Sequence, residues 1–498
     1  MFEYLCKPRD YEVALYSSRS KARPQLAGLI ALRNGKATVR NKEKRRPDNL
    51  EARAPRLWIQ HAATVLLLIV LIAIMVATGV KLHETLFLPR NYKNLDKKAL
   101  AQIQKDYTKF ESEFINLDKS THGYSVVVWA DNHSSRKTFG QLIKKINKEN
   151  DDNTAEWNQL KDRLARLKTD TTIAKETRDR MVAELEKEID EVHKQHLLFA
   201  VNSGDLAYDG DVTKYRLTLQ VADKLKIPMV TAIGNHDIRS NGRKAYREVW
   251  GPFTYSFSVG NAYYIMLDDA NEKRVDPAQM KWFEAELKKS LPYNYCFVDM
   301  HVPPFKGQRN QNAPMDKFLA DRKNAQAIKD LATKYHVTFV LAGHIHTYDA
   351  DEWPIPPGAP MAGMSPVRAA QQYTGFIISG GAGARLWKVD TGKNSVMSRA
   401  RYHYFDVTMN AEVPEVLENG QVVTKSKTGF RRQEINPTHA DAWYTFEETW
   451  VCIYAKIANL YPWEMLVLVP VFILLLAYLV LDERRRNKGT PGGPEEKI

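Results

Sequence analysis

Short apolar runs, each ending in small or polar residues, recur along the chain from residue 124 onwards. Seven of them read YSVVVWA, HLLFAVNS, PMVTAIG, AYYIMLD, YCFVDM, VTFVLA and GFIISG. Their length and their β-branched content are typical of buried strands, and stretches with helical periodicity, such as 213–225 and 277–289, lie between several of them. This alternation predicts an α/β fold.

Polar clusters follow five of these runs directly. They are Asp131-Asn132-His133, Gly204-Asp205, Gly234-Asn235-His236-Asp237, His301, and Gly343-His344-Ile345-His346. In an α/β sheet the side chains at the carboxyl ends of the strands converge on one crevice, so residues far apart in sequence can line one site. We therefore expect the five clusters to meet. The alternative for each cluster taken alone is a set of capping and turn residues.

The donors in these clusters predict a metal site. The candidate ligands are Asp131, His133, Asp205, Asn235, His301, His344 and His346. Carboxylate, amide oxygen and neutral imidazole suit manganese, zinc or iron, and the three cysteines are too few and too scattered for a cysteine-rich site or a disulfide framework. Seven ligands exceed what one tetrahedral ion needs, so we expect two divalent or trivalent ions, with Asp205 as a carboxylate that can bridge them.

With these motifs the chain resembles the calcineurin-like metallophosphoesterase superfamily, over roughly residues 125–383 and including the ISGGAGA that follows the last strand. The resemblance implies a four-layer α/β/β/α sandwich of two sheets flanked by helices. One ion would be bound by Asp131, His133, Asp205 and His346, and the other by Asp205, Asn235, His301 and His344. Manganese is the favoured metal. The resemblance also implies that His236 is not a ligand but protonates the leaving alkoxide or steadies the phosphoryl group.

The implied activity is metal-dependent hydrolysis of a phosphomonoester or a phosphodiester. Two cations neutralise the phosphate oxygens and lower the pKa of a bridging water, which attacks as hydroxide while His236 acts as the general acid. We predict Asp237 as a further catalytic residue that orients the His236 ring, with a turn-stabilising role for Asp237 as the alternative.

Two departures narrow the subfamily. Tyr208 stands at the spacing at which purple acid phosphatases bring in a tyrosinate iron ligand, but those enzymes lack the first-motif histidine, and this chain keeps His133. We expect His133 to be the ligand and Tyr208 to be a neighbouring or packing residue. Protein Ser/Thr phosphatases carry Asp-Arg-Gly after their Gly-Asp, and Tyr208-Asp209-Gly210 stands there instead, which disfavours a protein phosphatase.

Two apolar segments flank the predicted catalytic domain. Residues 62–80 are nineteen residues without a charge, about the length that crosses a bilayer core as a helix, and the alternative is a cleaved signal peptide. Residues 465–481 are a second, shorter predicted span, with a buried core helix as the alternative. Twelve Lys and Arg lie on the two outer flanks against five on the inner ones, so both termini are predicted to be cytoplasmic and the catalytic domain periplasmic, extracellular or lumenal.

The resulting organisation has seven parts. They are a basic cytoplasmic tail (1–56), a first transmembrane helix (57–80), an amphipathic linker helix (81–118), the metallophosphoesterase domain (119–409), a C-terminal extension (410–460), a second transmembrane helix (461–481) and a cytoplasmic tail (482–498). Within the domain, charged residues and apolar residues at helical spacing predict an inserted helical hairpin at 151–195, which is either a solvated decoration or a partner site.

The positive charge is concentrated at the amino terminus, because residues 1–56 carry 14 Lys and Arg against 6 Asp and Glu, out of a net charge of +13. This distribution fits a topology signal and contacts with anionic lipid better than nucleic-acid binding, so no nucleic-acid partner is expected.

Two segments bear on the substrate. The first, with Arg239, Arg243, Lys244 and Arg247, would hold a second phosphate or an acidic headgroup, unless it is a solvated helix face. The second, 353–366, is apolar and Pro-rich and would form a lid or dip into the bilayer, unless it is an ordinary packed loop.

Three functions are compatible with the sequence. Tethering to a membrane favours a lipid-linked or envelope-associated phosphoester as the substrate. An anchored phosphodiesterase that is nucleotide-directed or of broad specificity is the alternative. A non-catalytic metal-binding scaffold or sensor is the alternative from another class, and the intact ligand set and His236 disfavour it.

Overall fold

The computed structural model describes residues 54–88, 123–133, 135–307, 317–358, 360–386, 401–409, 415–416, 422–423, 429–435, 440–460, 467 and 470–481. The predicted amino-terminal tail up to residue 53, the predicted linker helix from residue 89 onwards and the predicted carboxyl-terminal tail lie outside these residues.

Among the described residues, a five-stranded mixed sheet carries the first three polar clusters. Its strand order is β13-β10-β1-β2-β3. The strands are β1 (Tyr124–Trp129), β2 (Leu197–Asn202), β3 (Met229–Thr231), β10 (Tyr402–Met409) and β13 (Gly429–Ile435). β1, β2 and β3 are parallel, and β10 runs antiparallel to both β1 and β13. β13 therefore extends this sheet from within the segment that was predicted as a C-terminal extension.

A six-stranded mixed sheet carries the other two clusters, in the order β4-β5-β6-β7-β9-β8. The strands are β4 (Tyr255–Val259), β5 (Ala262–Met266), β6 (Tyr295–Asp299), β7 (Phe339–Ala342), β8 (Tyr348–Pro354) and β9 (Tyr373–Ser379). β5, β6, β7 and β9 are parallel, while the outer strands β4 and β8 are antiparallel to their neighbours. A separate short pair joins β11 (Glu415–Val416) to β12 (Val422–Val423).

The two sheets pack face to face over an apolar and aromatic core. Val128 and Phe199 of the first sheet and Tyr264 and Phe297 of the second belong to this core. The rings of Phe199 and Tyr264 lie 5.2 Å apart and meet edge to face, a favourable geometry for an aromatic pair. Strands β1 and β2 are buried at every residue because helices cover the opposite face of their sheet as well.

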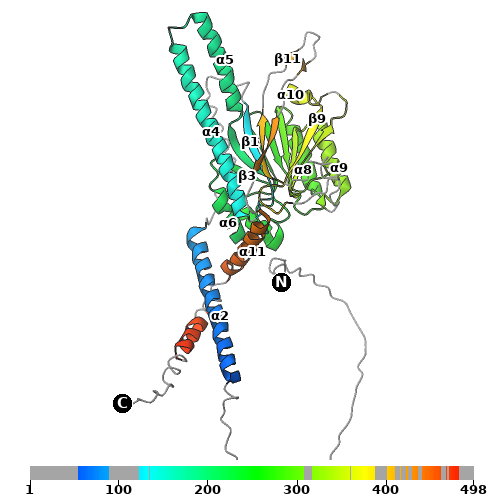
Figure 1. Ribbon diagram of the computed structural model, residues 1–498. Coiled ribbons are helices and arrows are strands. Elements are labelled where there is room, and N and C mark those ends of the chain that lie inside the picture. Colours follow the sequence, from blue (N-terminus) through cyan, green and yellow to red (C-terminus); the bar gives the residue numbers. More distant parts are fainter. Residues whose placement is uncertain are drawn as a thin grey trace, which may run out of the picture. The chain divides into compact units, whose positions relative to one another are not determined.

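Helices flank both sheets and complete a four-layer α/β/β/α arrangement (Figure 1). They are α4 (Arg136–Thr169), α6 (Val212–Ala222) and α7 (Gly242–Val249) on the first sheet, and α8 (Pro277–Lys289) and α9 (Arg322–Lys334) on the second. The short helices η2 (Arg239–Asn241) and α10 (Pro366–Ala369) lie in connections. The predicted sandwich is thus present, and both of its main sheets are mixed.

The predicted hairpin at 151–195 lies in α4 and α5 (Lys175–Lys194), which form a long antiparallel pair that extends away from the sheets in Figure 1. The two helices share a small apolar cluster of their own. It contains Trp157, Leu160, Leu185, Ile189 and Val192. The nearer part of α4 instead buries Phe139, Leu142 and Ile146 in the domain core.

Within the described residues, one helix is long and apolar enough to cross a membrane, namely the part of α2 (Ala54–Phe87) from Ala62 to Phe87. It includes the first predicted span, and a membrane anchor and a signal sequence both remain compatible with it. In the described part of the second predicted span there is a shorter apolar helix, Pro470–Leu481. The two-pass arrangement therefore stays a prediction.

Candidate dimetal site

The predicted ligands lie where the parallel strands of both sheets end. Asp131 and His133 follow β1, and Asp205 follows β2. His301 follows β6, and the His344–His346 pair follows β7. The carboxyl ends of the two sheets thus supply the site together, as the strand-end argument predicted.

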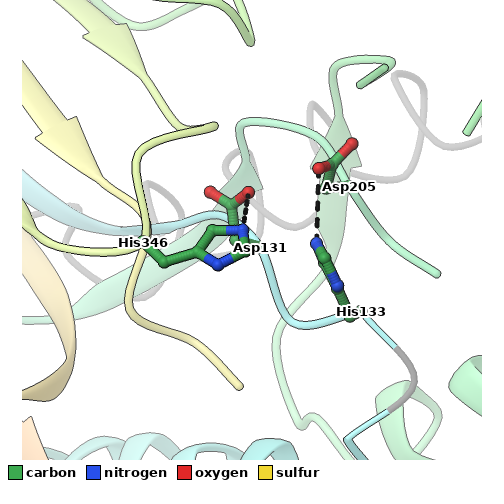
Figure 2. Close-up of side chains that lie close together, drawn as sticks. All are labelled: Asp131, His133, Asp205 and His346. Atoms are coloured by element: carbon green, nitrogen blue, oxygen red, sulfur yellow. Dashed lines mark ion pairs between the residues drawn. The ribbon is translucent and has the colours of Figure 1, made fainter. Parts of the chain in front are cut away.

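Two groups of side chains are close enough to hold a metal ion each. Asp131, His133, Asp205 and His346 form the first group, shown in Figure 2, and Asp205, His301 and His344 form the second. In each group the donor atoms lie within 4.8 Å of one another. Asp205 belongs to both groups, which is the position required of a bridging carboxylate.

Asn235 completes the second group with an amide oxygen. Its Oδ1 lies 3.0 Å from Nε2 of His301 and 3.0 Å from Nδ1 of His344. Its Nδ2 donates to the carboxylate of Glu272, so the amide is held with its oxygen towards the two histidines. All seven predicted ligands therefore lie in one place.

The charges in the site are strongly coupled. Burial alone raises the pKa of Asp205, but its interactions with His301, His236 and His133 outweigh this and hold that pKa well below its usual value. Burial alone lowers the pKa of His301, yet Asp205 and its negative neighbours raise it to about 10. The local potential therefore stabilises positive charge, which is the condition for binding metal cations.

Three histidines at the site are disposed to be neutral, unlike His346, whose pKa burial alone would lower but whose interactions with Asp131 raise it. Burial lowers the pKa of His133, and it lowers the pKa values of His236 and His344 well below the usual range. A neutral imidazole offers a lone pair, which a metal ligand requires.

Four candidate ligands have left-handed backbone conformations that residues with a Cβ adopt rarely. The φ angles are 60° at Asp131, 45° at His133, 57° at Asp205 and 66° at His344. Hydrogen bonds between the loops stabilise these strained conformations. The backbone N–H of Asp131 donates to the carbonyl of Gly204, that of His133 to the carbonyl of Asp205, and that of His344 to Oδ2 of Asp131.

At two positions in the motifs only glycine fits, because another loop approaches the backbone closely. A Cβ at Gly234 would overlap the carboxylate and the backbone nitrogen of Asp205, and a Cβ at Gly343 would lie 2.5 Å from the Cβ of Ala130. No side chain fits at either position, because the loops must touch for the ligands to converge.

Unsatisfied polar atoms show that the residues fit metal ions. Among the described residues, Oδ1 of Asp131, Nε2 of His133 and Oδ2 of Asp205 are buried without a hydrogen-bond partner. Nε2 of His133 faces Oδ2 of Asp205 at 3.3 Å, and Oδ1 of Asp131 faces Nε2 of His346 at 3.4 Å. Burying such atoms without a hydrogen bond is costly, and a cation held between them would satisfy these atoms. The donor set implies metal ions, because its oxygen and imidazole ligands are types that manganese, zinc and iron accept.

His236 lies beside the site but outside both groups. Its Nε2 is 3.9 Å from Oδ2 of Asp205. Its Nδ1 lies 2.6 Å from the carbonyl oxygen of Tyr208 and 2.8 Å from a nitrogen of Arg239. If Nδ1 carries the hydrogen and donates to Tyr208, the ring is held with Nε2 towards Asp205. Tyr208 thus contributes its backbone, while its ring meets the rings of His133 and His236 edge-on.

Asp237 directs its carboxylate at the backbone of the neighbouring loops. Its Oδ2 accepts hydrogen bonds from the N–H groups of Asp205 at 2.9 Å, Gly234 at 2.9 Å and Leu206 at 3.3 Å. Its Oδ1 accepts from the hydroxyl of Tyr215 at 3.2 Å. These contacts favour the turn-stabilising alternative over the prediction that Asp237 orients the His236 ring, because the backbone carbonyl of Tyr208 is in position to do that.

Several supporting residues carried no sequence signal. Glu272 accepts from Asn235, as described above. Asp269, with a pKa that burial raises to about 7, accepts from the backbone N–H groups of His301 and Val302 at 2.9 Å each. Asn132, between two candidate ligands, donates to the carbonyl of Leu206. Only Asn132 lies inside a recognisable motif.

The two segments considered for substrate binding differ from each other. Arg239 reaches His236, and Arg243 pairs with Asp268, whereas Lys244 and Arg247 are exposed on α7. In the second segment Trp353 belongs to strand β8, is buried and stacks on Phe376 of β9 at 4.9 Å, so that end of the segment is part of the sheet.

Comparisons with known proteins agree with this geometry. The chain matches the family model for calcineurin-like phosphoesterases over residues 167–348. That range contains the candidate ligands from Asp205 to His346, while Asp131 and His133 precede it.

Relatives carry two kinds of name. A probable cyclic nucleotide phosphodiesterase of Xenorhabdus bovienii is 29% identical over 171 residues, which cover 32% of this chain and 66% of that protein. A probable purple acid phosphatase of Arabidopsis thaliana is 29% identical over 142 residues, which cover 24% of this chain and 32% of that protein. The chain thus spans less than two thirds of the length of either relative.

The structure of a purple acid phosphatase from yellow lupin shares 14% identity, with a TM-score of 0.38 over 62% of this chain and 54% of that chain, too low a similarity to carry an argument. The family match and the relatives support the calcineurin-like metallophosphoesterase superfamily and phosphoester hydrolysis.

Proposed function

We propose that this chain is a membrane-anchored dimetal phosphoesterase that hydrolyses a lipid-linked or envelope-associated phosphomonoester or phosphodiester. One observation carries the proposal. Asp205 is common to two groups of metal-ligand atoms, and the imidazole of His236 lies beside it without belonging to either group. This is the arrangement that in-line displacement at phosphorus needs, with a cationic centre and a proton donor next to it.

The chain's own residues have separate tasks in this proposal. Asp131, His133, Asp205 and His346 would hold one ion, and Asp205, Asn235, His301 and His344 the other. When bound, the ions supply positive charge for the phosphate oxygens and an activated water as nucleophile. His236 would donate a proton from Nε2 to the leaving oxygen as the imidazolium, with its Nδ1–H held by the carbonyl of Tyr208. Burial lowers the pKa of His236, and the negative charge of a bound phosphate beside the ring would raise that pKa again and favour this protonated form.

Two different observations favour two different substrate classes. An apolar helix such as α2 would confine the site to a membrane surface, which favours a lipid-linked or envelope phosphoester. A second candidate, a cyclic nucleotide phosphodiesterase, is favoured by the names of two bacterial relatives that are 29% and 24% identical to this chain.

An activity screen of the detergent-solubilised full chain with manganese separates these candidates. The substrates would be p-nitrophenyl phosphate, bis(p-nitrophenyl) phosphate, cyclic AMP and vesicles of phosphatidic acid and phosphatidylglycerol. Release of phosphate or headgroup from the vesicles would support the lipid-linked substrate, and turnover of cyclic AMP alone would replace it by the nucleotide. If none of the four is hydrolysed with manganese, zinc or iron, the scaffold or sensor is the better description.

His236→Ala tests the assignment of roles. We expect turnover to fall by about 10²- to 10⁴-fold, because general acid catalysis contributes on this scale, while the metal content measured by mass spectrometry is unchanged. The matched control is His301→Ala, which removes a candidate ligand and should lower the metal content as well. Loss of metal from His236→Ala would contradict its place outside the ligand set.

A further inference from the structure

Helix α11 (Ala440–Ala458), which precedes the second predicted span, contacts the first ligand group although it lies far beyond the matched family range. The hydroxyl of Tyr444 is 3.3 Å from Nδ1 of His133, and both side chains are buried. This places a residue of the segment before the second predicted span directly behind a candidate metal ligand.

The orientation of His133 defines what Tyr444 does. Nε2 of His133 faces Oδ2 of Asp205 at 3.3 Å, inside the ligand group. A metal ligand needs its lone pair on that nitrogen, so the hydrogen of the neutral ring belongs on Nδ1. Nδ1 then donates to the oxygen of Tyr444, and the Tyr444 hydroxyl donates to the carboxylate of Glu448 one turn further along α11.

Other histidines of the site are oriented by the backbone. Nδ1 of His301 lies 2.8 Å from the carbonyl of Ser203, and Nδ1 of His346 lies 2.8 Å from the carbonyl of Arg385. For His133 the hydrogen-bond partner of Nδ1 is instead a side chain, the hydroxyl of Tyr444. Outer partners of this kind fix the tautomer and the ring angle of a ligand, and their loss costs about 10- to 100-fold in metal affinity or activity.

Several contacts of α11 hold Tyr444 in place. Glu447 accepts from the backbone N–H of Lys137 at 3.1 Å, in the first turn of α4, which follows His133 closely in the chain. The ring of Trp443 lies 4.3 Å from the ammonium of Lys137. At the other end, Asn459 accepts a hydrogen bond from Thr213 at 2.8 Å. The helix is therefore tied to the first turn of α4 and, through Asn459 just beyond its end, to α6.

We propose that Tyr444, backed by Glu448, is a positioning residue for His133, and that α11 is therefore part of the metal site. The inference rests on the proposed function, because it assumes that His133 binds a metal ion.

The test is a manganese titration of the chelator-treated full chain by calorimetry, with two ions expected to bind the wild type. Tyr444→Phe keeps the ring but removes the oxygen, and we expect it to weaken one binding event by about 10- to 100-fold and leave the other within about twofold. Tyr454→Phe is the matched control, since it removes a hydroxyl from the same helix that contacts His83 instead, and it should bind both ions normally.

Two further variants separate positioning from packing. Glu448→Gln keeps an acceptor for the Tyr444 hydroxyl and should bind metal nearly as the wild type does, whereas Glu448→Ala should share the defect of Tyr444→Phe. In a His133→Ala background, Tyr444→Phe should have no further effect on metal binding, because its effect passes through His133.

Wild-type affinity for both ions in Tyr444→Phe, or equal weakening of both, would overturn the role of Tyr444. A wild-type chain that binds no manganese, zinc or iron would overturn the proposed function itself, and it would do so before any variant is compared.

Discussion

Four of the eight described non-glycine residues with a left-handed backbone are candidate ligands. Each left-handed residue with a Cβ costs about 1–3 kcal/mol, and Asp131, His133, Asp205 and His344 all have this conformation. The strain persists because neighbouring loops supply hydrogen bonds to the same residues. Asp237 is central among these supports, since its buried carboxylate accepts from the backbone of Asp205 and of two neighbouring positions.

Asp237→Ala should therefore act on stability before chemistry. It leaves three buried N–H groups without their acceptor, and an unsatisfied buried group costs about 1–3 kcal/mol. We expect a loss of about 3–5 kcal/mol in the free energy of unfolding, together with a lower metal content. Denaturant unfolding followed by tryptophan fluorescence measures the first quantity, and mass spectrometry of the purified chain measures the second.

Asp237→Asn is the matched variant, because one amide oxygen can still accept from the loop, and it should lose less stability. A stable Asp237→Ala variant that keeps its metal but has lost turnover would instead support the original prediction of a catalytic Asp237.

Helix α4 belongs to two different cores along its length. Its first turns bury Phe139 and Ile146 under the five-stranded sheet, while its distal turns contribute Trp157 to the separate cluster shared with α5. The charged surface of the distal pair needs no partner to be soluble, which fits a solvated decoration. Local stability in such an element is expected to be independent of the domain that carries it.

Trp157→Ala should loosen the hairpin alone. Removing a buried tryptophan costs about 3–5 kcal/mol, and the lost contacts lie in the α4–α5 cluster. We expect faster hydrogen exchange in peptides from residues 150–190, with unchanged manganese affinity and an unchanged melting temperature of the domain.

Phe139→Ala is the control, since it removes a side chain that packs on Trp129 in the domain core, and it should lower the melting temperature. A similar drop in Trp157→Ala would show that the hairpin and the domain unfold together.

In the whole molecule, helix α2 exposes a large apolar surface. Leu66, Ile69 and Met75 are more than half exposed. The apolar part of the helix, Ala62–Phe87, is about 39 Å long at 1.5 Å per residue, which exceeds the hydrocarbon thickness of a bilayer. A membrane would bury this surface, whereas water would leave it as an aggregation-prone patch.

Two truncations test how many spans anchor the chain. Residues 1–459 lack the second predicted span and should stay in the membrane fraction after carbonate extraction, because α2 remains. Residues 83–498 lack the first span, and they should also stay there if the second span crosses the bilayer. Release of 83–498 into the soluble fraction would contradict the two-pass prediction. If the purified protein expressed from residues 1–498 has lost about 80 residues from its amino terminus, the first apolar segment is a cleaved signal peptide instead.

The convergence of the ligands could be predicted from the sequence, because a metal ion restricts the types of its ligands and the carboxyl ends of buried parallel strands lie at one edge of a sheet. Asp131, His133, Asp205, Asn235, His301, His344 and His346 were all predicted in this way, and the structure brings them together. The residues that contact and orient the ligands from outside the two groups could not be predicted. Tyr444 is 311 positions from His133, and no periodicity or motif links two such residues. The hydrogen bonds of Asp237 to the backbone and the packing of α11 behind His133 became visible only in the folded chain, because both depend on contacts between elements that are distant in the sequence.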